Sequence, residues 1–401
     1  MKKGFKLEFT AILAPEDYGP VMRSMIIGWN TPEELEWLKN YRFPGPVQER
    51  FVSDKAGYPD PKGKYYHVVP VTGPDIAWTM AFHWNEPMER NEYRNLGLPG
   101  LVCRNTVCPA LKLFTQRRPY TRLKNDMGYE VRFQYMDYLP PQYQTGRSVR
   151  KELKGTLPLI IWLHGAGEGG NKPSIAVLGN RVTALAEETV QMYFPETGAA
   201  VLVPQCPTMW MDIDGKCHYN DAYPDSDGRS FYTSALVEMI RRYVRYHPQI
   251  DRNRIYIGGC SNGGFMTLQL LLAMPGVFAA AYPCCPAYHA SWMNAERIRT
   301  LAKTPIWVTA AATDQTLPLK AKDGSPNHAD ALVQKLRAAS GNVVYTRLPQ
   351  VMGFDSKGFP YEYNGHFSWI PLLQDKITKE FDGEEIHLFE WLASQRKSGS
   401  K

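Results

Sequence analysis

From about residue 127 onward, segments with the apolar pattern of strands alternate with segments patterned like helices. Residues 129–135 alternate apolar and polar side chains, as in a strand with one buried face. Residues 157–163 and 199–203 are short apolar runs between breakers, which is typical of strands buried on both faces. Residues 236–244 carry apolar side chains at helical spacing with arginines between them, as in an amphipathic helix. Further strands are expected at 255–257, 277–282, 305–311 and 343–348, and further helices at 265–274, 330–339 and 384–393. This alternation predicts an α/β fold, with a mostly parallel sheet flanked by helices.

The first part of the chain has a different pattern. It is rich in Pro and Gly, holds four of the ten Trp, and shows helical periodicity only around residues 32–39. Strand patterns are expected at 6–12, 65–71 and 76–84. We therefore predict a β-rich accessory domain at residues 1–120 and a second domain at 121–401, with the boundary near 115–127.

The most informative local sequence follows the strand expected at 255–257. It reads Gly259-Cys260-Ser261-Asn262-Gly263, the G-x-S-x-G form of a nucleophile elbow, in which a sharp strand-to-helix turn exposes a serine hydroxyl. A side chain at either glycine would clash with the neighbouring strand and helix. The next ten residues are an apolar run that suits a buried helix. Ser261 is therefore the candidate nucleophile, and burial is expected for Cys260.

A serine nucleophile needs a base to accept its proton and an acid to orient that base. In folds with this elbow, the acid and then the histidine follow the serine in the chain. Asp314 lies just past an expected strand, at the edge where parallel sheets place ligand-facing groups; Asp355 is the alternative acid. His366 follows on a loop rich in glycine and aromatic residues, whereas His328 begins an expected helix and His387 lies within a helical pattern. We predict Asp314 as the acid and His366 as the base.

The tetrahedral oxyanion of acyl transfer needs hydrogen-bond donors aimed at it. One is expected from the backbone N–H of Asn262, the residue after the nucleophile. The second is expected from the glycine-rich loop 164–170, at Gly165 or Ala166, where small residues let the backbone approach a substrate carbonyl. The loop matches neither the phosphate-binding nor the dinucleotide-binding glycine pattern. A loop of purely structural value is the remaining alternative.

Composition narrows the classes of function. The chain has 401 residues, 44% of them hydrophobic and 21% charged, and a net charge of +6 from 46 basic and 40 acidic residues. These values are typical of a globular protein, and no basic tract suggests nucleic acid. No apolar run approaches the roughly 20 residues of a membrane span, and no signal peptide is evident. A cytoplasmic location is expected, or secretion if a signal peptide precedes this sequence.

Cysteine content bears on the redox compartment and on metals. Seven cysteines, an odd number in a long chain, fit a reducing compartment better than a disulfide framework. Cys103 and Cys108 have no second Cys or His pair nearby that would complete a zinc site. We therefore expect no metal and no cofactor, and the oligomeric state stays open.

Four motifs occur in the order typical of one group of hydrolases. They are Leu163-His164-Gly165-Ala166-Gly167-Glu168, Val203-Pro204-Gln205-Cys206-Pro207, Asp251-Arg252-Asn253-Arg254-Ile255-Tyr256 leading into the elbow, and Gly365-His366-Phe367-Ser368-Trp369. Over residues 127–395 the chain resembles α/β-hydrolases of the branch that contains polyhydroxybutyrate-depolymerase-like and feruloyl-esterase-like enzymes and predicted peptidases related to prolyl oligopeptidases. The resemblance implies an α/β-hydrolase catalytic domain with Ser261 as nucleophile, Asp314 as acid, His366 as base and the Gly165–Ala166 loop as oxyanion partner. Some members carry an N-terminal immunoglobulin-like domain, which the β-rich first part could match.

Two insertions set this chain apart from a minimal member of that branch. Residues 206–230 form a long polar and aromatic insertion, and residues 350–364 lengthen the approach to His366. Three aromatic residues are candidates for binding an aromatic or sugar-bearing acyl group, with ordinary packing as the alternative (Trp210, Tyr219 and Trp369). Loops at this edge decide what binds, so the substrate stays open.

These features predict a serine hydrolase that cleaves carboxylic esters through a Ser-His-Asp triad and an acyl-enzyme. Feruloyl or acetyl esters of carbohydrates are candidate substrates, and a small-molecule or carbohydrate-linked ester is the expected partner, with no nucleic acid and no membrane. The main alternative is a serine peptidase of the prolyl-oligopeptidase-like type, although no channel or specificity-pocket signature is recognisable. A non-catalytic binding protein on the same fold is a third possibility, but such proteins typically lose a triad member, and all three candidates are present.

Overall fold

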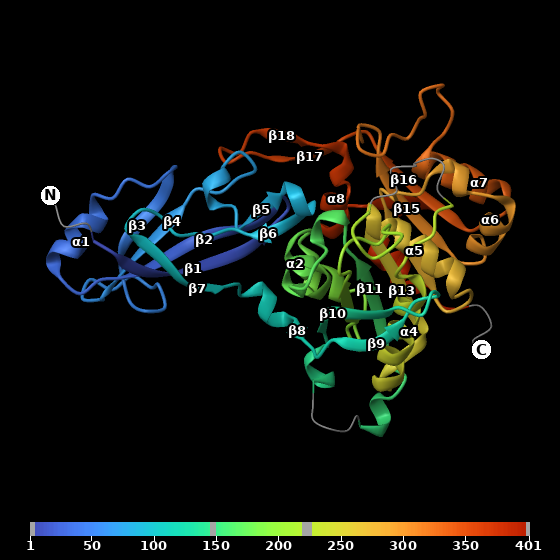
Figure 1. Cartoon of the computed structure of the whole chain (residues 1–401), viewed down its shortest axis with the longest axis horizontal. Coiled ribbons are helices and arrows are strands. Elements are labelled where there is room, and N and C mark those ends of the chain that lie inside the picture. The colour runs from blue at the N-terminus through green and yellow to red at the C-terminus, as the bar shows by residue number, and fades with distance from the viewer. Residues whose placement is uncertain (1–4, 145–149, 219–226, 398–401) are drawn as a thin grey trace. The chain divides into compact units, whose positions relative to one another are not determined.

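The computed structural model of this chain describes residues 5–144, 150–218 and 227–397, and its residues cluster into two compact units (Figure 1). The first unit comprises residues 1–113 together with the segment 352–361, and the second comprises residues 114–351 and 362–401. The boundary between the two units falls after residue 113, slightly before the range of 115–127 expected from the sequence. The first unit thus includes a segment that lies far along the sequence, shortly before His366.

The first unit is a β-rich body with its own apolar core, as expected. Its five-stranded sheet has the order β3-β4-β2-β1-β7, in which β1 is antiparallel to β2 and parallel to β7. Alternate side chains of β1 are buried, which agrees with the period of a strand that has one covered face. The elements are β1 (Leu7–Glu16), β2 (Gly19–Gly28), α1 (Pro32–Lys39), β3 (Val47–Ser53), β4 (Tyr65–Pro70), β5 (Phe82–Asn85), β6 (Arg90–Tyr93) and β7 (Leu101–Val107).

The strand expected at residues 76–84 is wrong in its first half. Ala77–Thr79 form a single 3₁₀ turn, and β5 begins only at Phe82. The N–H of Ile76 donates to Gly73, and that of Met80 donates to Ala77, so the backbone turns here instead of extending. The local apolar pattern therefore reflects a turn packed on the sheet.

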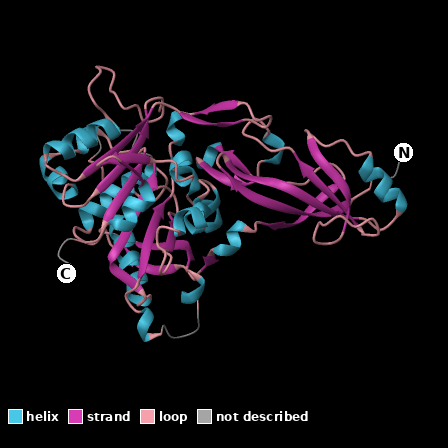
Figure 2. Cartoon of the chain, turned by 180° about the vertical axis from the view of Figure 1, so that it is seen from behind, coloured by secondary structure: helices cyan, strands magenta, loops and turns pink. Residues whose placement is uncertain are grey.

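The second unit is an α/β sandwich, and Figure 2 shows its helices lying against the sheet. The path through the sheet is β16-β15-β14-β13-β11-β12-β10-β8, with β9 paired to β10. Strands β11 to β16 pair in parallel, and β10 is antiparallel to β12. The strands are β8 (Thr115–Gln116), β9 (Tyr120–Lys124), β10 (Glu130–Tyr138), β11 (Leu157–Leu163), β12 (Ala200–Gln205), β13 (Ile250–Cys260), β14 (Ala280–Cys284), β15 (Ile306–Ala311), β16 (Val343–Leu348), β19 (Thr378–Phe381) and β20 (Glu384–His387). The hairpin strands β17 (Val351–Phe354) and β18 (Pro360–Tyr363) fall mostly within the segment 352–361, which belongs to the first unit.

Helices cover this sheet because both faces of its central strands are apolar. Every residue of β11 is buried. Its odd-numbered residues share a core with helices α4 to α7, while Ile160 and Trp162 are buried on the opposite face. The helices are α2 (Pro173–Leu178), α3 (Glu188–Gln191), α4 (Thr233–Tyr246), α5 (Asn262–Ala273), α6 (Ala295–Leu301), α7 (His328–Ala338), α8 (Trp369–Leu373) and α9 (Leu388–Ser394). Among the described residues, no helix is both long and apolar enough to cross a membrane.

Two elements expected from the sequence have different bounds in the structure of this unit. The strand expected at 277–282 begins later, at Ala280, because the N–H of Val277 bonds back to Met274 in a turn at Gly276. The helix expected at 384–393 begins only at Leu388. Residues 384–387 are instead β20, which pairs with β19 across a turn whose residues, Asp382 and Gly383, both have positive φ. Pairing with a neighbouring strand overrides the local helical pattern there.

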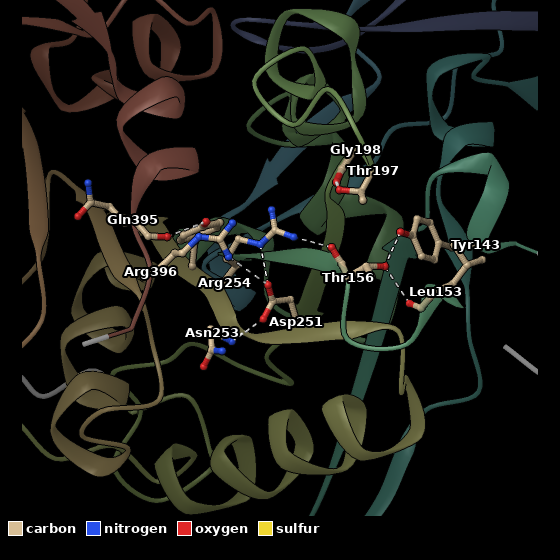
Figure 3. A network of polar contacts seen from close by, with 11 residues as sticks. Tyr143, Leu153, Thr156, Thr197, Gly198, Asp251, Asn253, Arg254, Gln395 and Arg396 are labelled. Atoms are coloured by element: carbon tan, nitrogen blue, oxygen red, sulfur yellow. Dashed lines mark hydrogen bonds and ion pairs between the residues drawn. The ribbon is translucent and has the colours of Figure 1, made fainter. Parts of the chain in front are cut away.

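A polar network fixes the amino end of β13, the strand that leads to Ser261 (Figure 3). The Arg254 guanidinium donates to Asp251 at 2.7 Å and to the Thr156 carbonyl, just before β11, at 2.6 Å. Arg396 lies 3.6 Å from the same carboxylate. The motif beginning at Asp251 is thus a clamp between two central strands, and the reactive groups lie at the opposite, carboxyl end.

Candidate active site

Ser261 lies in a strained turn between β13 and α5. Its φ of 54° and ψ of −114° are unusual for a residue with a side chain, and such a conformation costs about 1–3 kcal/mol. Three backbone hydrogen bonds of 3.0 Å hold it: the Ser261 N–H donates to Cys284, and the Ser261 carbonyl accepts from Phe265 and Ala287. These backbone hydrogen bonds to neighbouring segments hold Ser261 in the strained conformation.

The two elbow glycines are required by close backbone contacts. A Cβ on Gly259 would lie 2.3 Å from the carbonyl oxygen of Leu163, and one on Gly263 would lie 1.9 Å from the same atom. Neither separation is sterically possible, and a backbone carbonyl in a central strand has no room to move. The structure thus supports the physical reason for the G-x-S-x-G pattern.

His366 and Asp314 are in direct contact. His366 Nδ1 lies 2.9 Å from Asp314 Oδ2, and the two residues are 7% and 4% exposed. The other carboxylate oxygen, Oδ1, accepts hydrogen bonds from the N–H groups of Thr316 and Leu317 at 2.9 and 2.8 Å. Those two donors fix the carboxylate, so that Oδ2 faces the imidazole.

The loop that carries His366 approaches the Asp314 loop very closely. A Cβ on Gly365 would lie 2.4 Å from the carbonyl carbon of Thr313. Asn364 accepts the His366 N–H through its side chain at 2.9 Å, which starts a 3₁₀ turn at Gly365–Phe367. The glycine before His366 therefore permits the contact between the two loops.

The segment after β14 connects Ser261 to this pair. Cys284 accepts the Ser261 N–H, and the next residue, Cys285, has its Sγ within 4.8 Å of ligand atoms on both Asp314 and His366. The structure thus brings the elbow, the Asp314 loop and the His366 loop together at the carboxyl edge of the sheet. This edge is where open α/β sheets bind their ligands.

Electrostatics favour a base that binds its proton more tightly than usual. Burial by itself would lower the pKa of His366, but Cys285 and the hydrogen bond and charge of Asp314 outweigh it, so the pKa is raised above the ordinary 6.5. Burial also raises the pKa of the Cys285 thiol well above its usual value, so that this thiol is neutral at neutral pH. Asp314 is therefore the group that supplies the stabilising negative charge.

His164 holds the glycine-rich loop after β11. Its Nε2 accepts the N–H of Cys206 at 2.9 Å, so its proton is assigned to Nδ1, which donates to the Gly165 carbonyl at 2.6 Å. Complete burial lowers the pKa of His164 to about 4, so the ring stays neutral. In a trans peptide the C=O and N–H point in opposite directions. The N–H of Ala166 therefore points away from His164.

Asn262 is the first residue of α5, where backbone N–H groups have no partner within the helix. Its side-chain oxygen accepts the N–H of Trp210 at 2.6 Å and that of Met211 at 3.3 Å. These bonds tie the insertion 206–230 to the elbow.

The three candidate substrate aromatics differ in position. Trp210 is fully buried, packs at a tilt against His164 with ring centroids 5.0 Å apart, and donates its indole N–H to the His164 carbonyl. In this arrangement it presents no face to a ligand. Tyr219 lies outside the described residues. Trp369 is partly exposed, with its ring 5.6 Å from that of His366.

The alternative acid, Asp355, and the two other late histidines make contacts different from those of Asp314 and His366. Asp355 belongs to the first unit, where its carboxylate accepts the N–H groups of Lys357 and Phe359 in a turn. His387 contacts the Asp375 carbonyl at 2.8 Å. His328 starts α7 and is buried.

Sequence reasoning did not assign a role to His164 or to Cys285. For His164 a signal was present, because a histidine directly after a buried strand and before a glycine is placed to bond the loop backbone. For Cys285 there was none, since two adjacent buried cysteines look like ordinary core residues.

Comparison with known proteins gives three findings. The profile of the Phospholipase/Carboxylesterase family matches residues 146–345. A thermostable esterase of known structure superposes with a TM-score of 0.65 at 21% identity, covering 97% of this chain and 99% of that one. A probable chloroplastic glutamyl endopeptidase of Arabidopsis thaliana is 28% identical over 182 residues, which is 43% of this chain and 17% of that protein. The chain thus spans less than a fifth of the length of that plant relative.

Proposed function

We propose that this chain, a carboxylesterase-type α/β-hydrolase, is a serine hydrolase in which Ser261, His366 and Asp314 act together on carboxylic esters. The observation that carries the proposal is the 2.9 Å contact between His366 and Asp314, placed beside the segment that binds the Ser261 backbone. A strained serine at a strand-to-helix turn, a buried histidine and an oriented carboxylate are the three groups that acyl transfer needs.

The reaction follows from these groups. His366 Nε2 accepts the Ser261 proton as the hydroxyl oxygen attacks the ester carbonyl, and Asp314 stabilises the imidazolium through Nδ1. The protonated His366 then donates its proton to the leaving alcohol, which leaves an acyl-enzyme on Ser261. Water that loses its proton to His366 attacks this acyl-enzyme and releases the acid.

The oxyanion is held by the backbone N–H groups of Asn262 and Ala166 in this proposal. His164 supports the second donor, because its bond to the Gly165 carbonyl sets the orientation of the peptide that carries the Ala166 N–H. His164 is thus a positioning residue. Its low pKa keeps it neutral over the working range, so the proton on Nδ1 that sets this orientation is always present.

The proposed substrates are feruloyl or acetyl esters of carbohydrates. The partly exposed ring of Trp369, beside His366, supports an acyl or alcohol group with a flat or apolar face.

An ester panel together with an active-site probe tests this function. We expect the protein to hydrolyse p-nitrophenyl acetate and to favour either feruloyl or acetylated-sugar esters over longer acyl chains. A fluorophosphonate should add to one residue, and peptide mass spectrometry should locate it at Ser261. Absence of labelling, together with turnover no faster than buffer, would support the non-catalytic alternative.

A peptidase is the second candidate, and the match to a probable glutamyl endopeptidase favours it. An acylated glutamate presented as a p-nitrophenyl ester and as a p-nitroanilide gives a matched pair, because only the scissile bond differs. For an esterase, only the ester is turned over efficiently. Efficient cleavage of the anilide, with a preference for glutamate over glutamine, would move the assignment to the peptidase.

The raised pKa of His366 predicts how activity depends on pH. The base must be neutral to accept the Ser261 proton, so activity is lost as the pH falls through the pKa of His366. Since Asp314 raises that pKa, kcat/KM should rise with pH through a midpoint above the ordinary value of 6.5. The measurement is kcat/KM for p-nitrophenyl acetate from pH 5 to 9. A midpoint below 6.5 would mean that burial, and not Asp314, dominates at His366.

A further inference from the structure

One cluster of metal-ligating side chains stands out among the described residues, and the proposed reaction leaves one of its members unused. Cys285, Asp314 and His366 each offer one ligand atom, and these atoms all lie within 4.8 Å of one another. Asp314 and His366 have roles in the proposed mechanism, but the thiol of Cys285 has none. Cys285 follows β14, Asp314 follows β15, and His366 lies in the 3₁₀ turn 365–367, so separate loops bring the three residues together.

We propose that Cys285, Asp314 and His366 form a binding site for a thiophilic divalent cation such as Zn²⁺ or Cd²⁺, and that an ion bound there switches off hydrolysis. The binding part of this proposal stands on the ligand set alone. The loss of hydrolysis rests on the proposed function.

The donor set fits this class of cation. Thiolate sulfur, imidazole nitrogen and carboxylate oxygen are the ligands that zinc takes, at about 2.3, 2.0–2.1 and 2.0–2.2 Å. Tetrahedral ligands at those bond lengths stand roughly 3.3–3.8 Å apart. The Nδ1–Oδ2 separation of 2.9 Å must therefore widen slightly, and any pair near the 4.8 Å limit must close by about 1 Å. Hard cations such as Mg²⁺ and Ca²⁺ are excluded by the thiolate and imidazole, since they require oxygen ligands.

The backbone holds the Cys285 thiol beside the other two ligands. Cys285 has a φ of 35°, in the left-handed region that residues with a side chain rarely adopt, and its N–H donates to Thr309 at 2.7 Å. The neighbouring Cys284 Sγ instead lies 3.3 Å from the Ser368 hydroxyl. Two adjacent buried thiols therefore have different surroundings, which provides a matched control.

Binding has a defined proton balance. The Cys285 thiol loses its proton to solvent, because the thiolate is the form that ligates. At His366 the cation takes Nδ1, the atom that faces Asp314, and the ring proton moves to Nε2. An Nε2 that carries a proton has no lone pair for the Ser261 proton. The ion thus blocks the base without contacting Ser261.

Two side chains at this edge of the sheet reach solvent in part. The His366 side chain is 9% exposed, and Ser261 is partly exposed. Competition by substrate is therefore expected to slow the onset of inhibition.

Cadmium titration of the full-length, tag-free protein tests the proposal, because sulfur-to-cadmium charge transfer absorbs in the ultraviolet. The wild type and the variants Cys285→Ser and Cys284→Ser are titrated in parallel. We expect a charge-transfer component that is present in the wild type and in Cys284→Ser and is absent from Cys285→Ser. The same titration, followed by esterase activity, should show inhibition that a chelator reverses.

The expected weakening of inhibition in Cys285→Ser follows from the loss of one metal ligand. Replacing a partner that only orients a metal ligand typically weakens metal affinity about 10–100-fold, so we expect Cys285→Ser to weaken inhibition by at least about 100-fold. Each variant is compared with its own metal-free activity, and Cys285→Ala is a second variant if Cys285→Ser fails to fold. Persistence of both the absorption and the inhibition in folded Cys285 variants would overturn the site. The wild type could bind cadmium with the expected absorption yet lack esterase activity, while Cys285→Ser lost the absorption. That outcome would uphold the site and contradict the proposed function.

Discussion

Replacing Ser261 with alanine should abolish ester hydrolysis, with a loss in kcat of about 10⁶-fold on p-nitrophenyl acetate. The attacking oxygen is removed, and alanine has no atom that can form the acyl-enzyme. The fold should persist, because the three hydrogen bonds that hold this turn all involve backbone atoms. Alanine also keeps the Cβ, so the backbone strain is the same in both proteins.

Ser325→Ala is the matched control for this substitution. Ser325 is exposed in the same unit, and its hydroxyl bonds only to Asp323 among the described residues. Its kcat should equal that of the wild type. If Ser261→Ala retained full turnover while circular dichroism showed a native fold, the nucleophile would have to be sought elsewhere.

Replacing Asp314 with asparagine should lower kcat by roughly 10⁴-fold with little change in KM. The asparagine Oδ1 can keep the bonds from the Thr316 and Leu317 N–H groups, so its NH₂ faces His366. An NH₂ group donates, and it therefore favours the tautomer of His366 that carries the proton on Nε2. That tautomer has no lone pair for the Ser261 proton, and the charge that stabilises the imidazolium is also gone.

Asp355→Asn decides between the two acids that the sequence left open. The sequence offers Asp355 as the alternative catalytic acid, but its carboxylate accepts backbone N–H groups in a turn of the first unit. Its substitution should leave kcat within a factor of about two, since surface changes of this kind have small effects. A larger loss from Asp355→Asn than from Asp314→Asn would reverse the assignment.

Much of the fold followed from local patterns. The apolar runs predicted central strands with both faces covered, and β11 agrees with its expected range of 157–163. The helix predicted around 236–244 is also confirmed as the middle of α4. Local patterns failed where a neighbouring segment decided the outcome. Residues 384–387 became a strand because β19 lies beside them, and residues 77–79 became a turn through bonds between close neighbours.

The candidate site divides in the same way. The order of Ser261, Asp314 and His366, with each placed after a strand, was available from the sequence because parallel strands end at one edge of their sheet. Which side chains touch was not available. The contact between His366 and Asp314 depends on the close approach of two loops at Gly365, and the burial of Trp210 depends on its bonds to Asn262 and His164.

The sequence by itself determined that this protein has a nucleophile elbow at the end of a buried strand, because glycines and apolar residues there have a local steric meaning. Only the tertiary structure decided that His164 orients the oxyanion loop and that Cys285 lies against Asp314 and His366. Those contacts join residues from separate loops, and the distance between two loops is set by the packing of the whole sheet. No local pattern of residues encodes it.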